Sequence, residues 1–321
     1  MKIGVICNVN AQRVSRGISE RIKSILKNRA VVVAETKSIQ ELVDVIDKNF
    51  KTVDLWCFVG GDGTIGRGIN YLWYKSGMKD EIEIPILHGK AGSLNAIPDK
   101  IPLKGDLDDI MIRFRDLLDS MKDGSSIPRD NIRKFSTIKL HIKGFERPIL
   151  CFTFFMGVPF LISKKIIENR LKSKAKILQT IYTIIARFVI GEEGKDKFLK
   201  KIKAEIFVDG QKYPYLQHYV VLGSVFREPA LFFSPFAEVD KYKHGFFFFV
   251  YSGDVWTALK NFRTYATGKK RPPHSFSDIA SEVAIKAYNA GINHDGELLE
   301  SNTNILEIRA ETGPIVNLIK V

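Results

Sequence analysis

The sequence predicts two domains: an α/β domain built on a parallel sheet, followed by a β-rich domain of sandwich type. The chain has 321 residues, and at roughly 100 to 200 residues per domain this length suggests about two domains. Near its start, short apolar runs alternate with segments of helical periodicity, which indicates parallel strands covered by helices on both faces. Further along, longer β-type runs are separated by short turns, which is typical of antiparallel structure.

The first domain is expected to span residues 1–130. Its opening apolar run, residues 3–7, predicts a buried strand, and apolar residues at helical spacing predict a helix over residues 16–27. The same two patterns recur along this part of the chain. They predict strands at residues 31–34, 55–59 and 84–87 and a helix over residues 39–46.

The second domain is expected to span residues 131–307. Strands are predicted at residues 137–142, 149–155, 204–208, 219–222 and 245–251. The short turns between strands are Lys143-Gly144, Asp209-Gly210 and Ser252-Gly253. Residues 161–190 are predicted to be helical, and Pro272-Pro273 breaks the chain before a last group of short strands.

Composition indicates a folded protein with an anionic partner. Hydrophobic residues make up 45% of the chain and charged residues 26%, which excludes the composition of a disordered protein. The 49 Lys and Arg exceed the 36 Asp and Glu, so the net charge is +13, which favours nucleic acid, an acidic membrane face or phosphorylated substrates. Charge alone does not choose among these partners.

Cysteine placement and hydropathy bear on the compartment. Cys7, Cys57 and Cys151 each lie in an apolar run, far from one another, so we expect reduced core residues of a cytoplasmic protein. The apolar run at residues 3–7 is too short for a signal peptide. The longest apolar stretch, residues 177–190, is interrupted by Gln179 and Arg187, whereas a membrane span needs about 20 apolar residues. No transmembrane helix is expected.

A glycine-rich turn follows the strand predicted at residues 55–59. Residues 58–66 read F-V-G-G-D-G-T-I-G and run into an apparent helix. Glycines allow main-chain N–H groups to approach a polyphosphate, and the N-terminus of a helix favours negative charge. In that setting Asp62 can hold Mg²⁺ against the phosphates or polarise the acceptor, and Thr64 can donate to a phosphate oxygen. The alternative is a tight turn in which Asp62 only caps the helix.

Two further segments carry polar residues suited to the same chemistry. Residues 89–96 follow the strand predicted at 84–87, and neighbouring parallel strands end at one crevice, so this loop can meet the glycine turn around one ligand. A plain turn is the alternative there. Near the carboxyl end, Asp295-Gly296 is a hairpin signal. Glu297, which follows it, can accept a hydroxyl proton in phosphoryl transfer.

Three motifs, taken in order, resemble those of a known family. G-G-D-G-T occupies residues 60–64, G-S-L-N-A residues 92–96 and D-G-E residues 295–297. Together they resemble the diacylglycerol kinase catalytic-domain family, which includes bacterial diacylglycerol kinase-like lipid kinases and the sphingosine and ceramide kinases. The match spans nearly the whole chain. The first motif also occurs in NAD kinases and phosphofructokinases, so the set of three gives the specificity.

The resemblance implies a fold and a set of site residues. The first domain would be an NAD kinase/diacylglycerol kinase-like nucleotide-binding domain, completed by about residues 308–321 with a strand in 314–321, and the second would bind the lipid acceptor. ATP and Mg²⁺ would be the cofactors, Asp62 and Glu297 the catalytic carboxylates, and Asp62 also the metal ligand. The nucleotide site would contain Asn8, Thr36, Gly60, Gly61, Asp62, Gly63, Thr64, Ile65, Gly66, Arg67, Gly92, Ser93 and Asn95.

Several positions depart from the family pattern. Gly66 and Arg67 stand where most members have Asn or Asp followed by Glu, and this charge reversal beside the phosphates either tightens nucleotide binding or changes how the nucleotide lies. Of the family's N-P-x-S-G opening only Asn8 remains. His244 stands where bacterial members have an Asp that helps to hold a structural Mg²⁺, and imidazole is a poor ligand for that cation. Ala96 brings the second motif closer to the sphingosine and ceramide branch.

A lipid substrate would require contact with a membrane. Two basic clusters suit an anionic surface, although solvated helix faces are the alternative. The first is Lys164, Lys165, Arg170, Lys172, Lys174 and Lys176, and the second is Lys269, Lys270 and Arg271. The 22 Phe residues concentrate in the second domain, where core strands explain them better than an acyl-chain channel. We expect a cytoplasmic, peripherally membrane-associated protein. Self-association as a homodimer is left open.

Two other functions compete with a lipid kinase. A soluble-substrate kinase of the NAD kinase type would be active without lipid. A catalytically silent protein that binds a nucleotide or a membrane is motivated by Gly66, Arg67 and His244. Nucleic-acid binding ranks last, because the basic clusters lack a recognition helix or an aromatic RNA-binding motif.

Overall fold

The computed structural model describes residues 1–11, 14, 17–27, 29–91, 103, 105–121, 125–169, 175–180, 183, 200–229, 234–237, 244–301 and 303–321. The chain forms two compact units. The first comprises residues 1–136 and 314–321, and the second residues 137–313. An α/β unit thus comes first and a β-rich unit second, which confirms the predicted fold class.

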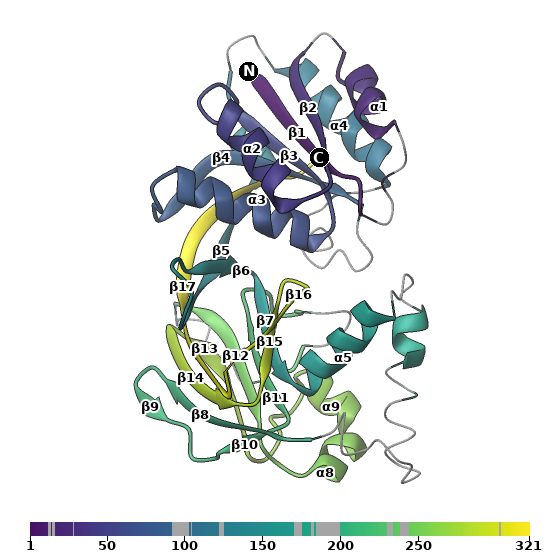
Figure 1. Cartoon of the computed structure of the whole chain (residues 1–321). Coiled ribbons are helices and arrows are strands. Elements are labelled where there is room, and N and C mark those ends of the chain that lie inside the picture. Colours follow the sequence, from purple (N-terminus) through teal and green to yellow (C-terminus); the bar gives the residue numbers. More distant parts are fainter. Residues whose placement is uncertain are drawn as a thin grey trace. The chain divides into compact units, whose positions relative to one another are not determined.

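The first unit is a parallel sheet with helices on both faces (Figure 1). The sheet order is β17-β4-β3-β1-β2, and all neighbours are parallel. The elements are β1 (Lys2–Asn8), α1 (Ile18–Ile25), β2 (Ala30–Thr36), α2 (Ile39–Asn49), β3 (Leu55–Gly60), α3 (Asp62–Lys75), β4 (Glu81–Lys90) and α4 (Leu107–Ser120), with the end of β17 (Ile305–Ile319). The strands and helices predicted for this domain are all present.

Right-handed crossovers explain which face each helix covers. The chain moves outward from β1 to β2 and then back past β1 to β3, so α1 and α2 must lie on opposite faces. The step from β3 to β4 continues in the second direction and keeps α3 beside α2, where Asp47 accepts from Tyr71 Oη at 2.6 Å and pairs with Lys75 at 2.7 Å. On the other face, α1 lies beside α4, and Arg21 pairs with Asp108.

The second unit is a sandwich of antiparallel sheets whose facing sides form one core. One sheet contains β5 (Ile132–Ile142), β6 (Ile149–Cys151), β8 (Ile202–Val208), β9 (Gln211–Lys212), β10 (Gln217–His218), β14 (Glu282–Tyr288) and the start of β17. The other contains β7 (Thr153–Gly157), β11 (Val220–Ser224), β12 (Phe246–Tyr251), β13 (Ser275–Ala280), β15 (Gly291–His294) and β16 (Glu297–Glu300). Helices α5 (Val158–Glu168), α8 (Val255–Lys260) and α9 (Phe262–Ala266) complete the described part.

The phenylalanines of β12 are core residues on both faces of their sheet. Phe246 and Phe248 pack in the core between the two sheets, whereas Phe249 belongs to a second cluster on the opposite face with Leu222 and Phe236. Strands covered on both faces read as continuous apolar runs, as this one does. The core interpretation of the described phenylalanines of this strand is therefore confirmed.

Three predicted elements differ in the structure. Residues 149–155 are not one strand, because β6 and β7 belong to different sheets and the chain changes sheet at Phe152. The helix predicted over 161–190 ends at Glu168 as α5, and the chain is helical again at residues 175–180. Ser252-Gly253 is not a turn between strands, since α8 follows it directly.

The last strand also begins earlier than the resemblance implies. The expected strand within residues 314–321 is the second half of β17, which starts at Ile305. Its first half pairs with β14 in the second unit and its second half with β4 in the first. Pro314 lies between the residues of β17 that pair with β14 and those that pair with β4.

The cysteines and the helices bear on two expectations, one about burial and one about membrane crossing. Cys7, Cys57 and Cys151 are free and buried, as predicted, and burial raises the pKa of Cys7 to about 12. Within the described ranges, no helix has the length and apolarity that crossing a bilayer requires.

Candidate functional site

Four polar or glycine positions lie at the carboxyl edge of the parallel sheet in the first unit. Asn8 ends β1 and is in register with Thr36, the last residue of β2. Gly60 ends β3 and is in register with Lys90, the last residue of β4. Ligands of open α/β sheets bind at this edge, so the register brings the sequence-predicted residues of these strands to the expected place.

The main chain at Gly60 is fixed by two donors. Its carbonyl oxygen accepts from Ala91 N at 2.9 Å and lies 3.2 Å from Nε2 of His88. A carbonyl can only accept, so Nε2 of His88 carries the proton in this contact. His88 is completely buried, and burial lowers its pKa to about 4 against the opposing effect of the Gly60 hydrogen bond. The ring is therefore neutral at pH 7.

Gly60 and Thr64 fit together because Gly60 lacks a side chain. A Cβ on Gly60 would lie 2.3 Å from Oγ1 of Thr64, closer than real atoms approach. Oγ1 in turn accepts from Nδ2 of Asn8 at 3.0 Å. Because Asn8 donates in this contact, the hydroxyl proton of Thr64 can be donated to another acceptor, such as a phosphate oxygen.

The first turn of α3 has a glycine cap and no side-chain cap hydrogen bond. Its N-cap is Gly61 and Asp62 is the first helical residue, so Asp62 does not occupy the cap position that the alternative interpretation gave it. By contrast, Ser38 caps α2 and Asp106 caps α4 with their side chains. A helix that begins with glycines presents its first N–H groups without an intervening side chain.

The remaining residues of the glycine motif differ in exposure. Ile65 is fully buried on the core side of α3, so only its main chain is available to a ligand. Gly66 is buried and Arg67 is exposed. Gly92, Ser93 and Asn95, predicted to join the same site, lie outside the described residues.

Glu297 lies in the second unit, at the start of β16. It is in register with His294, and the two-residue turn between them is Asp295-Gly296, with φ angles of 47° and 88°. Both residues are in the left-handed region that a type I′ hairpin requires, which confirms the hairpin predicted from Asp-Gly. Glu297 is half-buried.

Asp295 anchors this hairpin to the point where the chain changes sheet. Its carboxylate accepts from the N–H of Phe152 at 2.9 Å, from the N–H of Thr153 at 2.9 Å and from the Thr153 hydroxyl at 3.1 Å. Asp295 is buried, so these bonds replace the water that the carboxylate loses. Asp295 thus holds the strand end that carries Glu297.

Two residues of β4 that lie beside the glycine turn were missed by sequence reasoning. The predicted strand at 84–87 stops short of His88 and Lys90, which the structure includes in β4. Lys90 brings a cation to the same sheet edge as Gly60. For Lys90 the signal was present, since a strand three residues longer would have ended level with Gly60.

His244, the position expected to have lost a metal ligand, is among the described residues. His244 is exposed, and its carbonyl oxygen accepts from the Ser281 hydroxyl at 3.0 Å. Among the residues that the structure describes, no three His, Cys, Asp or Glu side chains converge as a metal site. Within the glycine turn, Asp62 is the residue that carries a carboxylate.

Solved structures from Bacillus anthracis share this fold. One, named a diacylglycerol kinase, has 14% sequence identity and a TM-score of 0.60. Two, named as candidate diacylglycerol kinases, have 16% and 15% identity and a TM-score of 0.64 each. All three alignments cover 100% of this chain and 97% of the other chain. No protein-family model matches the sequence. No curated protein matches it either. At such low identity the likeness shows the fold, and it confirms the fold that the three motifs implied.

Proposed function

We propose that the protein is an ATP-dependent kinase that transfers the γ-phosphoryl group to a hydroxyl of a membrane lipid, such as diacylglycerol or a sphingoid lipid. The observation that carries the proposal is the glycine-led N-terminus of α3 at the carboxyl edge of the sheet, with Thr64 held by Asn8 beside it. The fold shared with structures named diacylglycerol kinases supports the choice of acceptor class.

The first unit supplies the phosphate site in this proposal. The phosphates lie against the main chain of residues 60–63, where the N–H groups of the α3 first turn favour negative charge. Thr64 donates its hydroxyl proton to a phosphate oxygen, and Lys90 and Arg67 add positive charge nearby on the same unit. Asp62 would hold Mg²⁺, which when bound neutralises charge on the phosphate oxygens.

The second unit supplies the acceptor side and the base. Glu297 accepts the proton of the lipid hydroxyl while the oxygen of that hydroxyl forms a bond to the γ-phosphorus. The bond between that phosphorus and the bridging oxygen of ADP breaks, and ADP leaves with the electron pair. Main-chain bonds to Asp295 hold the Glu297 hairpin in place, so the base is carried by a fixed strand end.

Replacement of the turn carboxylate tests the phosphate site. Asp62→Asn should reduce transfer from radiolabelled ATP to lipids in mixed micelles by about 10²-fold or more, because a Mg²⁺ ligand is lost. Asp44→Asn on α2, at an exposed position, is the matched control and should leave turnover unchanged. A lipid panel of diacylglycerol, phosphatidylglycerol, sphingosine and ceramide identifies the acceptor. Unchanged turnover in Asp62→Asn would refute the assignment.

A second substitution tests the base. Glu297→Gln should lower kcat by about 10²- to 10⁴-fold with little change in the KM for ATP, since a general base contributes in that range. Glu300→Gln, at the other end of β16, removes an exposed carboxylate that pairs with Lys164 and should have little effect. A loss below about tenfold in Glu297→Gln would place the base elsewhere. Transfer to a soluble acceptor without any lipid would favour the NAD kinase-type alternative.

A further inference from the structure

Helices α8 and α9 are anchored to the second sheet of the sandwich by their inner sides. Asp254 caps α8 by accepting from Thr257 N at 2.7 Å. Ala258 packs against the cluster formed by Leu222, Phe236, Phe249 and Tyr251. At the end of α9, the carbonyl of the buried Ala266 accepts from Ser234 N at 2.6 Å. The pair therefore has a fixed inner face and a defined outer one.

The outer face presents large aromatic side chains to solvent. Trp256 on α8 is 46% exposed and Phe262 on α9 is 48% exposed. Apolar area of this kind is costly in water and gains free energy where it is buried. At the far end of the same segment, Oη of Tyr215 lies 2.6 Å from Nδ1 of His274, and Tyr215 and its neighbour Leu216 are also exposed. A second exposed aromatic group is thus found where this segment ends, at His274.

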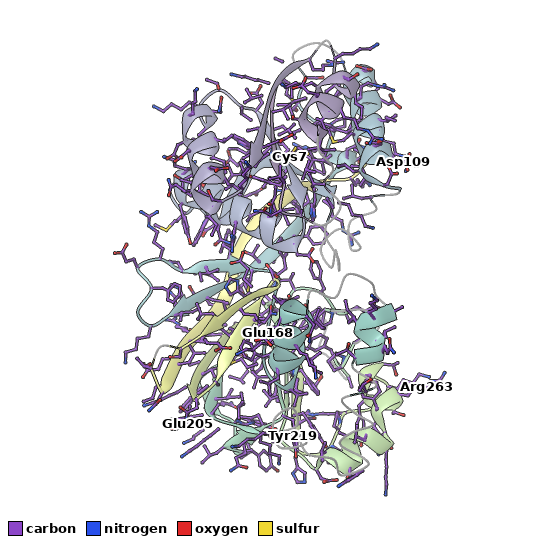
Figure 2. All side chains as sticks on the ribbon, turned by 45° about the vertical axis from the view of Figure 1, so that its right-hand side comes forward. Cys7, Asp109, Glu168, Glu205, Tyr219 and Arg263 are labelled. Carbon is purple, nitrogen blue, oxygen red and sulfur yellow. The ribbon has the colours of Figure 1, made fainter. Side chains whose placement is uncertain are left out.

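The segment that carries these aromatics is also rich in exposed basic side chains. Lys260, Arg263, Lys269 and Lys270 are exposed, and none forms an ion pair with a described residue. Arg263 projects away from α9 in Figure 2. With Arg271, residues 254–274 carry five basic side chains and one acid, Asp254, so their net charge is 5 − 1 = +4. The acid is already engaged as the cap of α8.

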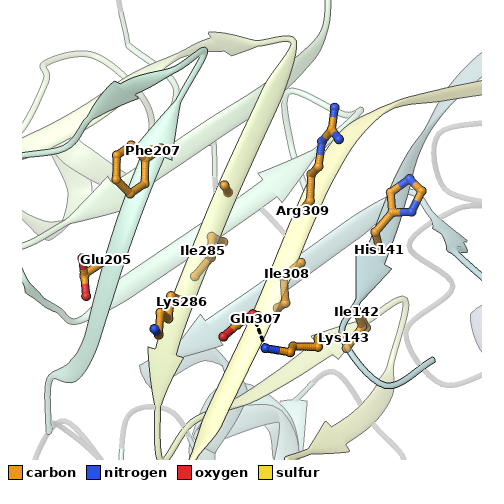
Figure 3. Close-up of a pocket in the computed structure, with 11 residues that line it drawn as sticks. His141, Ile142, Lys143, Glu205, Phe207, Ile285, Lys286, Glu307, Ile308 and Arg309 are labelled. Carbon is orange, nitrogen blue, oxygen red and sulfur yellow. Dashed lines mark hydrogen bonds and ion pairs between the residues drawn. The ribbon is translucent and has the colours of Figure 1, made fainter.

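Another surface of the second unit shows that this excess is not general. An open hollow of about 550 Å³ on the outer face of the first sheet is lined by charged residues of β5, β8, β14 and β17 (Figure 3). Most charges there are paired: Lys143 with Glu307 at 2.9 Å, and Arg309 with Glu282 at 2.7 Å. Lysines and arginines of that hollow are thus largely compensated by carboxylates, unlike the basic residues of α8, α9 and the segment that follows them.

We propose that the outer face of α8 and α9 docks onto an anionic lipid bilayer. Tryptophan and phenylalanine partition to the boundary between headgroups and acyl chains, and the basic side chains are attracted by acidic headgroups. Lysine and arginine can keep their charged ends in water while their stems lie along the apolar surface. The inference rests on the proposed function, because a membrane lipid as acceptor is what brings the protein to a bilayer.

The tryptophan content gives a direct readout. Of the three tryptophans, Trp56 and Trp73 are 0% and 3% exposed in the first unit, so Trp256 alone meets solvent. Vesicles of phosphatidylcholine with about one-third phosphatidylglycerol should shift the emission of the full chain to shorter wavelength. Brominated acyl chains should quench it, and Trp256→Phe should remove both signals while vesicle binding persists. Binding of the wild type without shift or quenching would overturn the inserted geometry.

Charge and aromatic variants locate the surface. Lys269→Ala with Lys270→Ala should weaken co-sedimentation with these vesicles by about tenfold or more, because each basic residue near an anionic surface contributes to binding. Phe262→Ser should weaken it as well. The matched controls are Lys48→Ala with Lys51→Ala and, for the aromatic, Phe145→Ser, which is 48% exposed on another part of the second unit. Equal binding by the surface variants and their controls would overturn the proposal.

Activity on dispersed lipid separates this inference from the proposed function. In detergent mixed micelles, where no bilayer has to be reached, the α8 and α9 variants should transfer phosphate at the wild-type rate. Wild-type protein that binds vesicles through this face but phosphorylates no lipid would leave the docking intact and refute the kinase. Transfer in micelles by a wild-type protein that does not bind anionic vesicles would refute the docking and leave the kinase.

Discussion

At the scale of single residues, the glycine turn is specified by what surrounds Gly60. Its missing Cβ makes room for Thr64, and its carbonyl is held by Ala91 and His88. The motif predicted Gly60 and Thr64, because both residues belong to the G-G-D-G-T pattern and can be recognised from the sequence. His88 could not be found in that way, since a buried histidine whose described partner is a main-chain carbonyl leaves no periodic or spacing signal.

His88 should make the stability of the fold sensitive to mild acid. Its pKa is lowered from the ordinary 6.5 to about 4, mainly by burial. Between those values the unfolded chain binds a proton that the folded protein does not, so the free energy of unfolding decreases as pH falls through this window. The full shift corresponds to about 3 kcal/mol lost by about pH 4, with no further loss from this group below it.

The free energy of unfolding of His88→Gln, obtained from urea unfolding at several pH values, measures this contribution. The variant should be less stable than the wild type at neutral pH, and the difference should shrink as the pH is lowered from about 7 to about 4.5, because glutamine does not titrate. His244→Gln, at an exposed position, is the control and should follow the wild-type curve. Parallel curves for the wild type and His88→Gln would show that His88 does not remain neutral in the folded state.

At the scale of elements, two hairpins have the same Asp-Gly turn, but their aspartates accept hydrogen bonds from different parts of the chain. Asp209-Gly210 and Asp295-Gly296 both have positive φ angles, with 48° and 47° at the aspartates. Both turns were predicted from Asp-Gly. Only Asp295 is buried. It accepts from the N–H of Phe152, the residue at which the chain changes from one sheet to the other. That change was not predicted, because residues 149–155 are apolar except for Thr153 and periodicity cannot show which sheet a residue joins.

Asparagine at the two turns separates turn chemistry from anchoring. Asn-Gly forms the same turn as Asp-Gly, so the turn itself should tolerate both changes. Asp295→Asn replaces a carboxylate oxygen with an amide that faces donors, and the free energy of unfolding should fall by about 2 to 4 kcal/mol. Asp209→Asn, with exposed bonds to the N–H groups of Ser281 and Glu282, should cost less than about 1 kcal/mol. Equal effects in urea unfolding would contradict the anchoring role.

The helices α8 and α9 show a different limit of element prediction. Each is only one to two turns long, and a segment of that length offers too few positions for a helical period to be recognised. What positions them is tertiary: the Asp254 cap and the packing of Ala258 against the second cluster. Sequence reasoning did mark the Lys269 to Arg271 cluster, but not the aromatic face beside it.

At the scale of the whole molecule, the order of strands along the chain predicted the fold class, whereas the strand common to both units was only half predicted. β17 joins β14 through its first half and β4 through its second, across Pro314. The resemblance implied a strand only within residues 314–321. In the structure the partner changes there, so the strand continues.

The share of β17 in the first unit leads to a prediction for a shortened chain. Val316, Leu318 and Ile319 are fully buried, and burial of side chains of this size contributes about 1.5 to 3 kcal/mol each. Asn317 also donates to Glu81 and to the carbonyl of Ile82 along β4. Their combined loss is comparable to the whole stability of a typical domain, about 5 to 15 kcal/mol. Deletion of residues 314–321 should therefore unfold the first unit.

Tryptophan emission can follow that unfolding in a Trp256→Phe background, where only the buried Trp56 and Trp73 of the first unit remain. The chain that ends at Gly313 should emit at longer wavelength than its parent. It should also not bind ATP, because the parallel sheet that contains Gly60 has lost β17, the strand next to β4. Removal of residues 320–321 alone spares the buried side chains and should leave both properties intact. If the longer deletion kept its short-wavelength emission, β4 would be stable as an edge strand and the end of β17 would be dispensable for the sheet of the first unit.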